Sequence, residues 1–309
     1  GLTAAEKETA LRAAALCKAD LVTHMVVEMT SLQGIMGRYY ALHSGETPQV
    51  AEAIFEHYQP RYTGDELPAS KAGLVVGIAD RLDSLAGLFA AGLAPTGTKD
   101  PFAQRRAAIG LVQLLSNFDL RFDLAKWLSA AANELPIPAT EESLRSCLEF
   151  VVGRQRSSLI EQGYRYDVVD AVLAAQQNNP AGVLRAVRQL TGWIIKPEWL
   201  LTLQAYARCV RITRDQKETY TINEQVLQEP TEQELFAELK KAQNALRDED
   251  SVDEFFTRFT PMIPAINRFF DAVLVMAEDP AVRANRLGLL QGIAALARNT
   301  ADLSLLEGF

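Results

Sequence analysis

The chain has 309 residues, of which 48% are apolar, and it carries a formal net charge of −8. This length exceeds the usual size of one domain, so we expect two or three domains with buried cores. The acidic balance argues against a protein whose whole surface contacts phosphate, and the lack of an uncharged apolar run of about 18 residues argues against a membrane-spanning helix.

Apolar residues recur at steps of three and four along most of the chain, and alternating β-branched runs are rare. This pattern predicts a nearly all-α protein. Residues 3–36 predict one or two helices, with Thr3 and Glu6 spaced as a capping box. Gly34 and Gly37 lie near the end of this segment, where exposed helical glycines would each cost about 1 kcal/mol relative to alanine. We therefore expect these two glycines to pack against another helix.

Residues 71–115 predict two buried apolar helices joined by a loop at 94–99. One face of the first helix carries little side-chain bulk, at Gly73, Gly77, Asp80, Ser84 and Gly87. Another face carries the large apolar residues Leu74, Ile78, Leu82, Leu85 and Phe89. Because bulky partners would prevent close packing on small residues, we expect Gly73 and Gly77 to meet Gly34 and Gly37. Asp100 and Pro101 predict the start of the second helix.

Asp80 lies on the face with little bulk, which is expected to be buried. A buried carboxylate needs a partner, and Arg38, Arg105 and Arg106 are the candidates. A structural ion pair is a commoner explanation for such an acid than a catalytic role.

Prolines and helix-start signals divide the rest of the chain. The motif LPIPAT at 135–140 stops any helix, so we place the first domain at 1–138. Residues 139–195 predict three helices that form a spacer, and 196–309 form the third domain. Two capping boxes are predicted in the third domain, at Thr231 with Glu234 and at Ser251 with Glu254.

Charge is unevenly distributed in the third domain. From 185 to 217 there are seven basic residues against two acids, a local charge of +5, whereas 218–254 holds eleven acids against three bases, a local charge of −8. Arg208, Arg211 and Arg214 recur at steps of three on one predicted helix, and Lys217 follows it. This segregation permits a basic nucleic-acid surface on an acidic protein, although an ordinary solvated helix face would carry the same charges.

Three long runs resemble the β subunit of the bacterial two-subunit glycyl-tRNA synthetase. They are LQGIMGRYYALHSGE at 32–46, ADRLDSLAGLFAAGLAPTGTKDPFAQRRAAIGLVQLL at 79–115, and FFDAVLVMAEDPAVRANRLGLL at 269–290. The last run is similar to the helical anticodon-binding domain shared with arginyl-type synthetases. Since the chain also begins with Gly1 instead of Met, we expect it to be the C-terminal part of such a subunit.

The resemblance implies that the α subunit holds ATP, Mg²⁺ and glycine, and that the β subunit positions glycine tRNA for aminoacylation. The expected partners are therefore this tRNA and the α subunit, in the cytoplasm, with no membrane, no cofactor in this portion and no catalytic activity of its own. The residues expected to bind tRNA are Arg208, Arg211, Arg214, Lys217, Arg283 and Arg286. Arg286 has an alternative role as the internal partner of Asp271 or Asp279. Tyr206 and Tyr220 are weaker candidates for stacking on bases, whereas Trp193 and Trp199 are expected in the core.

The first domain resembles the histidine-aspartate phosphohydrolase fold, which holds a divalent metal beside a phosphate ester. The matching position here is Cys17-Lys18-Ala19-Asp20, which keeps only the aspartate, and Asp80 or Asp83 would supply the other carboxylate. The three histidines lack paired spacing, and the three cysteines are widely separated, so we expect neither a metal site nor a disulfide. Two alternatives stay open, a metal-dependent phosphohydrolase and a helical scaffold for protein interactions.

Overall fold

The computed structural model describes residues 1–62, 64–245 and 251–309. Across these ranges the fold consists of helices and loops without a strand, and one isolated antiparallel bridge joins Thr96 to Lys99. The predicted all-α class is therefore confirmed. No helix in the described ranges is both long and apolar enough to cross a membrane.

The chain divides into two compact units. The first contains Gly1–Ser158 with Asn178–Ala181, and the second contains Leu159–Gln177 with Gly182–Phe309. The predicted spacer at 139–195 is thus shared between the two units, and its standing as a separate domain stays a prediction.

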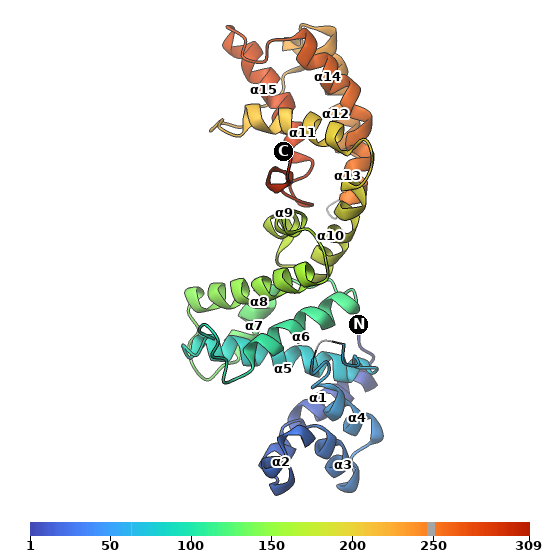
Figure 1. The fold of residues 1–309 in the computed structure, drawn as a ribbon, viewed down its shortest axis with the longest axis vertical. Coiled ribbons are helices and arrows are strands. Elements are labelled where there is room, and N and C mark those ends of the chain that lie inside the picture. Colours follow the sequence, from blue (N-terminus) through green and yellow to red (C-terminus); the bar gives the residue numbers. More distant parts are fainter. Residues whose placement is uncertain (63, 246–250) are drawn as a thin grey trace. The chain divides into compact units, whose positions relative to one another are not determined.

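The first unit begins with a capped helix, in which Thr3 Oγ1 accepts a hydrogen bond from the backbone N–H of Glu6 and Thr3 N–H donates to the Glu6 carboxylate. The predicted capping box is therefore present. Figure 1 shows the helices of this unit in blue to green. They are α1 (Ala4–Leu16), η1 (Ala19–Val22), α2 (His24–Glu28), η2 (Thr30–Leu32), α3 (Ile35–His43), α4 (Pro48–Glu56), α5 (Lys71–Ala90), α6 (Gln104–Asn117), α7 (Leu124–Asn133) and α8 (Glu141–Glu161), whose last turn lies beyond the unit.

Helix α5 is shared by two apolar cores. The large apolar residues predicted on one face are all buried, and they pack with residues of α6, α7 and α8. Ala72 and Val76 on another face pack with residues of α1, α3 and α4. The prediction that 71–115 forms two buried helices is confirmed, although α6 begins at Gln104 and the Asp100 carboxylate accepts from the N–H groups of Gln104 and Arg105.

Gly73 and Gly77 allow α5 to lie directly against the C-terminal end of α4. A Cβ atom at Gly73 would lie 2.6 Å from Glu56 Cβ, and one at Gly77 would lie 3.0 Å from the carbonyl oxygen of His57. Both distances are too short for an unstrained side chain, so the predicted close approach exists. Its partner is α4 and not the expected pair of glycines.

Gly34 and Gly37 serve a different contact. Gly34 is the N-cap of α3 with φ of +76°, and a Cβ at Gly37 would lie 2.9 Å from Ile54 Cγ2. The buried carboxylate of Asp20 accepts hydrogen bonds from the N–H groups of both glycines, at 2.6 and 3.1 Å. The prediction that they meet Gly73 and Gly77 is wrong because α4 and the two residues that follow it lie in contact with both pairs.

The second unit is built around aromatic residues of α11 and α13. Tyr206 packs edge-on against Phe255 and Phe259, and Trp199 packs against Phe256. Helix α11 contacts α14 and α15, and α12 also packs on α14 and α15. The elements of this unit are α9 (Tyr166–Gln176), α10 (Pro180–Ile194), whose first two residues belong to the first unit, α11 (Trp199–Thr213), η3 (Glu224–Val226), α12 (Pro230–Asn244), α13 (Val252–Phe259), η4 (Thr260–Met262), α14 (Ile263–Ala272), α15 (Pro280–Ala295) and η5 (Leu303–Leu305).

The helix starts of the second unit agree in part with the sequence pattern. The capping box of Ser251 with Glu254 opens α13 as predicted. The box predicted at Thr231 is wrong, because Glu229 and Glu232 cap α12 and Pro230 occupies its first position. Proline at that position starts the helix earlier, since its missing N–H is not needed there.

Candidate functional site

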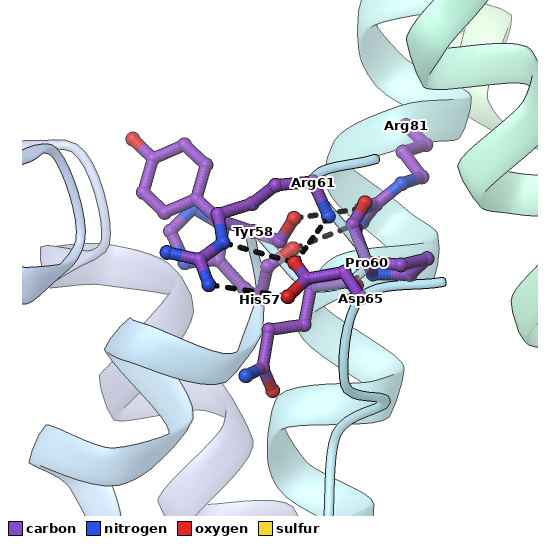
Figure 2. A network of polar contacts seen from close by, with 7 residues as sticks. His57, Tyr58, Pro60, Arg61, Asp65 and Arg81 are labelled. Carbon is purple, nitrogen blue, oxygen red and sulfur yellow. Dashed lines mark hydrogen bonds and ion pairs between the residues drawn. The ribbon is translucent and has the colours of Figure 1, made fainter. Parts of the chain in front are cut away.

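The end of α4 and the start of the following loop surround a buried arginine (Figure 2). The side chain of Arg81 donates to five backbone carbonyls, and none of these bonds is longer than 3.1 Å. The accepting carbonyls belong to His57, Tyr58, Gln59, Pro60 and Gly77. Arg81 is 6% exposed, and burial lowers the pKa of its guanidinium to about 10 because it disfavours the charged form. The carbonyl ring therefore holds a buried positive charge.

A second cation lies next to this network. Lys18 Nζ is 2.9 Å from Asp80 Oδ1 and 3.1 Å from His57 Nε2, and it lies 4.5 Å from the ring centre of Tyr58. His57 Nδ1 lies 2.5 Å from the carbonyl oxygen of Ile54. Since Nδ1–H donates to this carbonyl, Nε2 carries the lone pair that accepts from the ammonium.

The ionisation of His57 follows from this position. Burial, followed by the charge of Lys18, lowers the pKa of His57 to about 4. The imidazole is therefore neutral at pH 7 and adds no charge to the network.

The partner of Asp80 differs from the predicted ones. Asp80 is half-buried and pairs with Lys18, whereas the candidates were Arg38, Arg105 and Arg106. The sequence pattern could not identify Lys18, because the turn after α1 reaches Asp80 only through the packing of α1 on α5. The prediction of an ion pair is confirmed, and the prediction of its partner is wrong.

The donor set around Asp80 does not fit a divalent metal. Lys18 places its ammonium between Asp80 and His57, where it would repel a metal ion, and Asp20 uses one oxygen to hold backbone N–H groups. Asp83 is exposed on another part of α5. Within 1–62, 64–245 and 251–309, no three His, Cys, Asp or Glu residues group as metal ligands. The assignment of this unit to the histidine-aspartate phosphohydrolase fold stays a prediction.

The basic residues of α11 lie largely on the surface of the second unit. Arg208 is half-buried, with its guanidinium 4.2 Å from the ring centre of Phe270. Arg211 is exposed, 5.4 Å from the ring centre of Phe309. Arg214 and Lys217 are also exposed, at the end of α11 and just beyond it. Their guanidinium and ammonium groups are accessible to phosphate oxygens.

The two arginines of α15 have different environments. Arg283 is half-buried and donates to the carbonyl of Ala277 at 3.2 Å. Arg286 is only 8% exposed, pairs with the carboxylate of Glu232 and donates to the carbonyl of Leu274 at 2.9 Å. Arg286 therefore has the internal role that the sequence left open, with Glu232 of α12 as its partner in place of Asp271 or Asp279. Its burial removes it from any exposed basic surface.

The acidic stretch at 218–254 is partly engaged in ion pairs of its own. Glu224 pairs with Lys240, Glu238 with Lys241 and Glu234 with Arg268. Asp248, Glu249 and Asp250 lie outside the described residues. The described acids near α12 are thus neutralised locally in several places, which weakens their repulsion of a phosphate backbone.

Comparisons with known proteins match two separate parts of the chain. The model of the glycyl-tRNA synthetase beta subunit family matches residues 2–174, more than half of the chain. This chain belongs to that family. A second model, the DALR anticodon binding domain, matches residues 202–306. The resemblance proposed from the sequence is therefore confirmed.

Curated relatives in this beta subunit family cover nearly all of the chain. It is 40% identical over 307 residues to the glycine–tRNA ligase beta subunit of Moorella thermoacetica, covering 96% of this chain and 44% of the relative. The Clostridioides difficile protein of the same name is 38% identical, covering 97% and 44% respectively, and that of Alteromonas mediterranea is 38% identical, covering 98% and 45%. The chain thus spans less than half the length of these beta subunits.

The structure also identifies residues that the sequence analysis missed in this family member. Arg81 donates to the carbonyls at the end of α4. The only sign of this role in the sequence is a charged residue four positions after Gly77 on an apolar helix. Glu56 is buried and accepts from the N–H groups of Ala69 and Ser70, which ties α4 to the start of α5. Tyr206 is buried with its hydroxyl bonded to the carbonyl of Ala294, so its ring is not available for stacking on a base.

Proposed function

We propose that this chain is the tRNA-binding and assembly portion of a glycine–tRNA ligase beta subunit. It positions glycine tRNA for aminoacylation at an α subunit, which supplies the site for ATP, Mg²⁺ and glycine. The relatives are named as beta subunits of glycine–tRNA ligase, which supports both the tRNA and the α partner. On this proposal the chain has no catalytic site of its own and acts in the cytoplasm.

One observation carries the proposal. The exposed basic residues Arg211, Arg214 and Lys217 lie in the segment that matches an anticodon binding domain. Guanidinium and ammonium groups bind phosphate oxygens, and each such contact releases counterions from the nucleic acid. A local basic surface thus explains how a chain with a net charge of −8 binds RNA.

The proposed tRNA contacts are Arg208, Arg211, Arg214, Lys217 and Arg283. Arg208 and Arg283 are half-buried and keep internal hydrogen-bond partners, so they contribute positioning as well as charge. Arg286 supports this surface indirectly, because its ion pair with Glu232 holds α15 against α12.

The test is an equilibrium titration of the chain with glycine tRNA and with a non-cognate tRNA at several stated salt concentrations. Arg211→Ala and Lys217→Ala should each weaken glycine tRNA binding and reduce the salt slope by about 0.9. Arg145→Ala is the matched control, because Arg145 is an exposed arginine of the first unit.

Two outcomes count against the proposal. Unchanged affinity and salt slope in both variants would exclude this surface. Equal affinity for the two tRNAs would exclude discrimination by this portion of the subunit.

A further inference from the structure

A cavity of about 220 Å³ opens beside the Arg81 network of the first unit. It is bounded by the loop before α3, the segment that follows α4, α5 and the start of α6. At about 30 Å³ per molecule, this volume corresponds to roughly seven waters. The cavity therefore has room for a small polar group together with part of its water shell.

The charged residues that line this cavity are mostly basic. Arg61, Arg81 and Arg106 lie on its wall, and Asp80 is the one acid among the lining residues that the structure describes. Arg61 is neutralised by Asp65, with Nε 2.9 Å from Oδ2, and the resulting ion pair is drawn in Figure 2.

The remaining charges leave an excess of positive charge. Asp80 is neutralised by Lys18, while Arg81 is held by carbonyl dipoles and the side chain of Arg106 makes no hydrogen bond or ion pair in the described parts of the chain. The carboxylate of Asp20 does not line the cavity, and its Oδ2 accepts hydrogen bonds from backbone N–H groups. The cavity thus favours an anion.

Three side chains offer hydrogen-bond donors that the described fold does not use. They are the amide of Gln33 in the loop before α3, the hydroxyl of Ser84 on α5 and the guanidinium of Arg106 on α6. Donors that line one cavity from several segments are suited to an oxyanion with several acceptor oxygens.

An aromatic ring completes the wall. Phe102 is 50% exposed and lines the cavity just before α6 begins. A half-exposed ring beside an anion site offers a surface on which a nucleobase can stack.

We propose that this cavity binds the phosphate group of a nucleotide at Gln33, Ser84 and Arg106, while the base stacks on the half-exposed ring of Phe102. The same chemistry is present in a free nucleoside monophosphate and in one nucleotide of a single-stranded RNA. The site belongs to the first unit, whereas the residues assigned to tRNA binding above belong to the second, so it does not rest on that assignment.

The experiment is a calorimetric titration of the whole chain with adenosine 5′-monophosphate, inorganic phosphate and adenosine. We expect one site, with the monophosphate bound more tightly than phosphate and with adenosine bound most weakly. Arg106→Ala should raise the dissociation constant for the monophosphate by about tenfold or more, because it removes a charge-assisted donor. Phe102→Ala should weaken the binding of the monophosphate and leave the binding of phosphate unchanged.

Arg145→Ala is the matched control for charge, since it removes an exposed arginine outside the cavity and should leave the titrations unchanged. Ser84→Asp is a second variant that adds a carboxylate to the wall, and it should abolish binding of both phosphate compounds. Circular dichroism of each variant shows whether the helices are retained.

A single-stranded RNA hexamer without terminal phosphates distinguishes the two sources. Hexamer binding weakened by Arg106→Ala assigns the site to an RNA strand, and monophosphate binding without hexamer binding assigns it to free nucleotides. The proposal is overturned if neither ligand binds, or if Arg106→Ala and Ser84→Asp leave binding unchanged. Arg211→Ala should not affect the monophosphate titration, so the failure of this site and of the tRNA surface are distinguishable.

Discussion

Replacing Arg286 with methionine should strongly destabilise the second unit. The carboxylate of Glu232 is 1% exposed, and its ion pair with Arg286 joins α12 to α15. Glu232 also accepts from the N–H groups of Gln228 and Glu229 at 2.7 and 2.9 Å, so it cannot turn toward solvent without uncapping α12. Arg286→Met therefore leaves a buried charge without its partner.

The expected loss is large for a single substitution. Removing one member of a buried ion pair costs about 3–5 kcal/mol, and the carbonyl of Leu274 loses its donor as well. The double variant that combines Glu232→Gln with Arg286→Met leaves no buried charge, so it should lose less stability than Arg286→Met alone. Arg283→Met is the matched control on the same helix, and it should cost about 1 kcal/mol, the value of one hydrogen bond.

Urea unfolding followed by tryptophan fluorescence measures this loss. Trp193 and Trp199 both pack on Phe256 in the second unit, and a Trp127→Phe background removes the signal of the first unit. A free energy of unfolding for Arg286→Met within about 1 kcal/mol of the parent, equal to that of Arg283→Met, would refute the role assigned to the buried pair.

Three further predictions concern the first unit. His57 has a pKa of about 4 in the folded chain, below the ordinary value of 6.5 for a histidine side chain, so the stability from its neutral form is fully present above pH 6.5 and is lost as the pH falls toward 4. The full effect is about 3 kcal/mol, and urea midpoints measured from pH 7.5 to 4 should show a flatter pH dependence in His57→Gln. Gly77→Leu should cost about 1–3 kcal/mol by overpacking α5 against the end of α4, and an unchanged melting temperature would contradict this contact. Manganese, magnesium or nickel should not produce hydrolysis of phosphodiesters or cyclic nucleotides, whereas metal-dependent turnover abolished by Asp20→Ala would show that a hydrolytic site exists.

The residues of the proposed tRNA surface and Arg286 of the buried pair could be recognised in the sequence only as basic residues. Arg211 and Arg286 each lie on a helix that carries apolar residues at steps of three and four, and local sequence treats them alike. Arg211 is exposed and Arg286 is 8% exposed, because α12 packs on α15 and brings Glu232 to it. The distinction between a surface contact and a structural pair depends on a residue 54 positions away.

Local sequence by itself determined the helices, the apolar face of α5 and two of the capping boxes. These features depend on residues within a few turns of one another, so periodicity and cap spacing are sufficient to predict them. The long runs shared with the beta subunit family also identified the family without any structure.

Tertiary structure alone decided which helices meet and which charges are paired. Gly73 and Gly77 approach α4 and not Gly34, Asp80 pairs with Lys18, and Arg81 is held by carbonyls around the end of α4. A small residue permits a close approach and a buried charge requires a partner, but neither requirement specifies which distant residue meets it. That choice is made when the apolar faces of all the helices are buried together, since only then do side chains far apart in the sequence come within hydrogen-bonding distance.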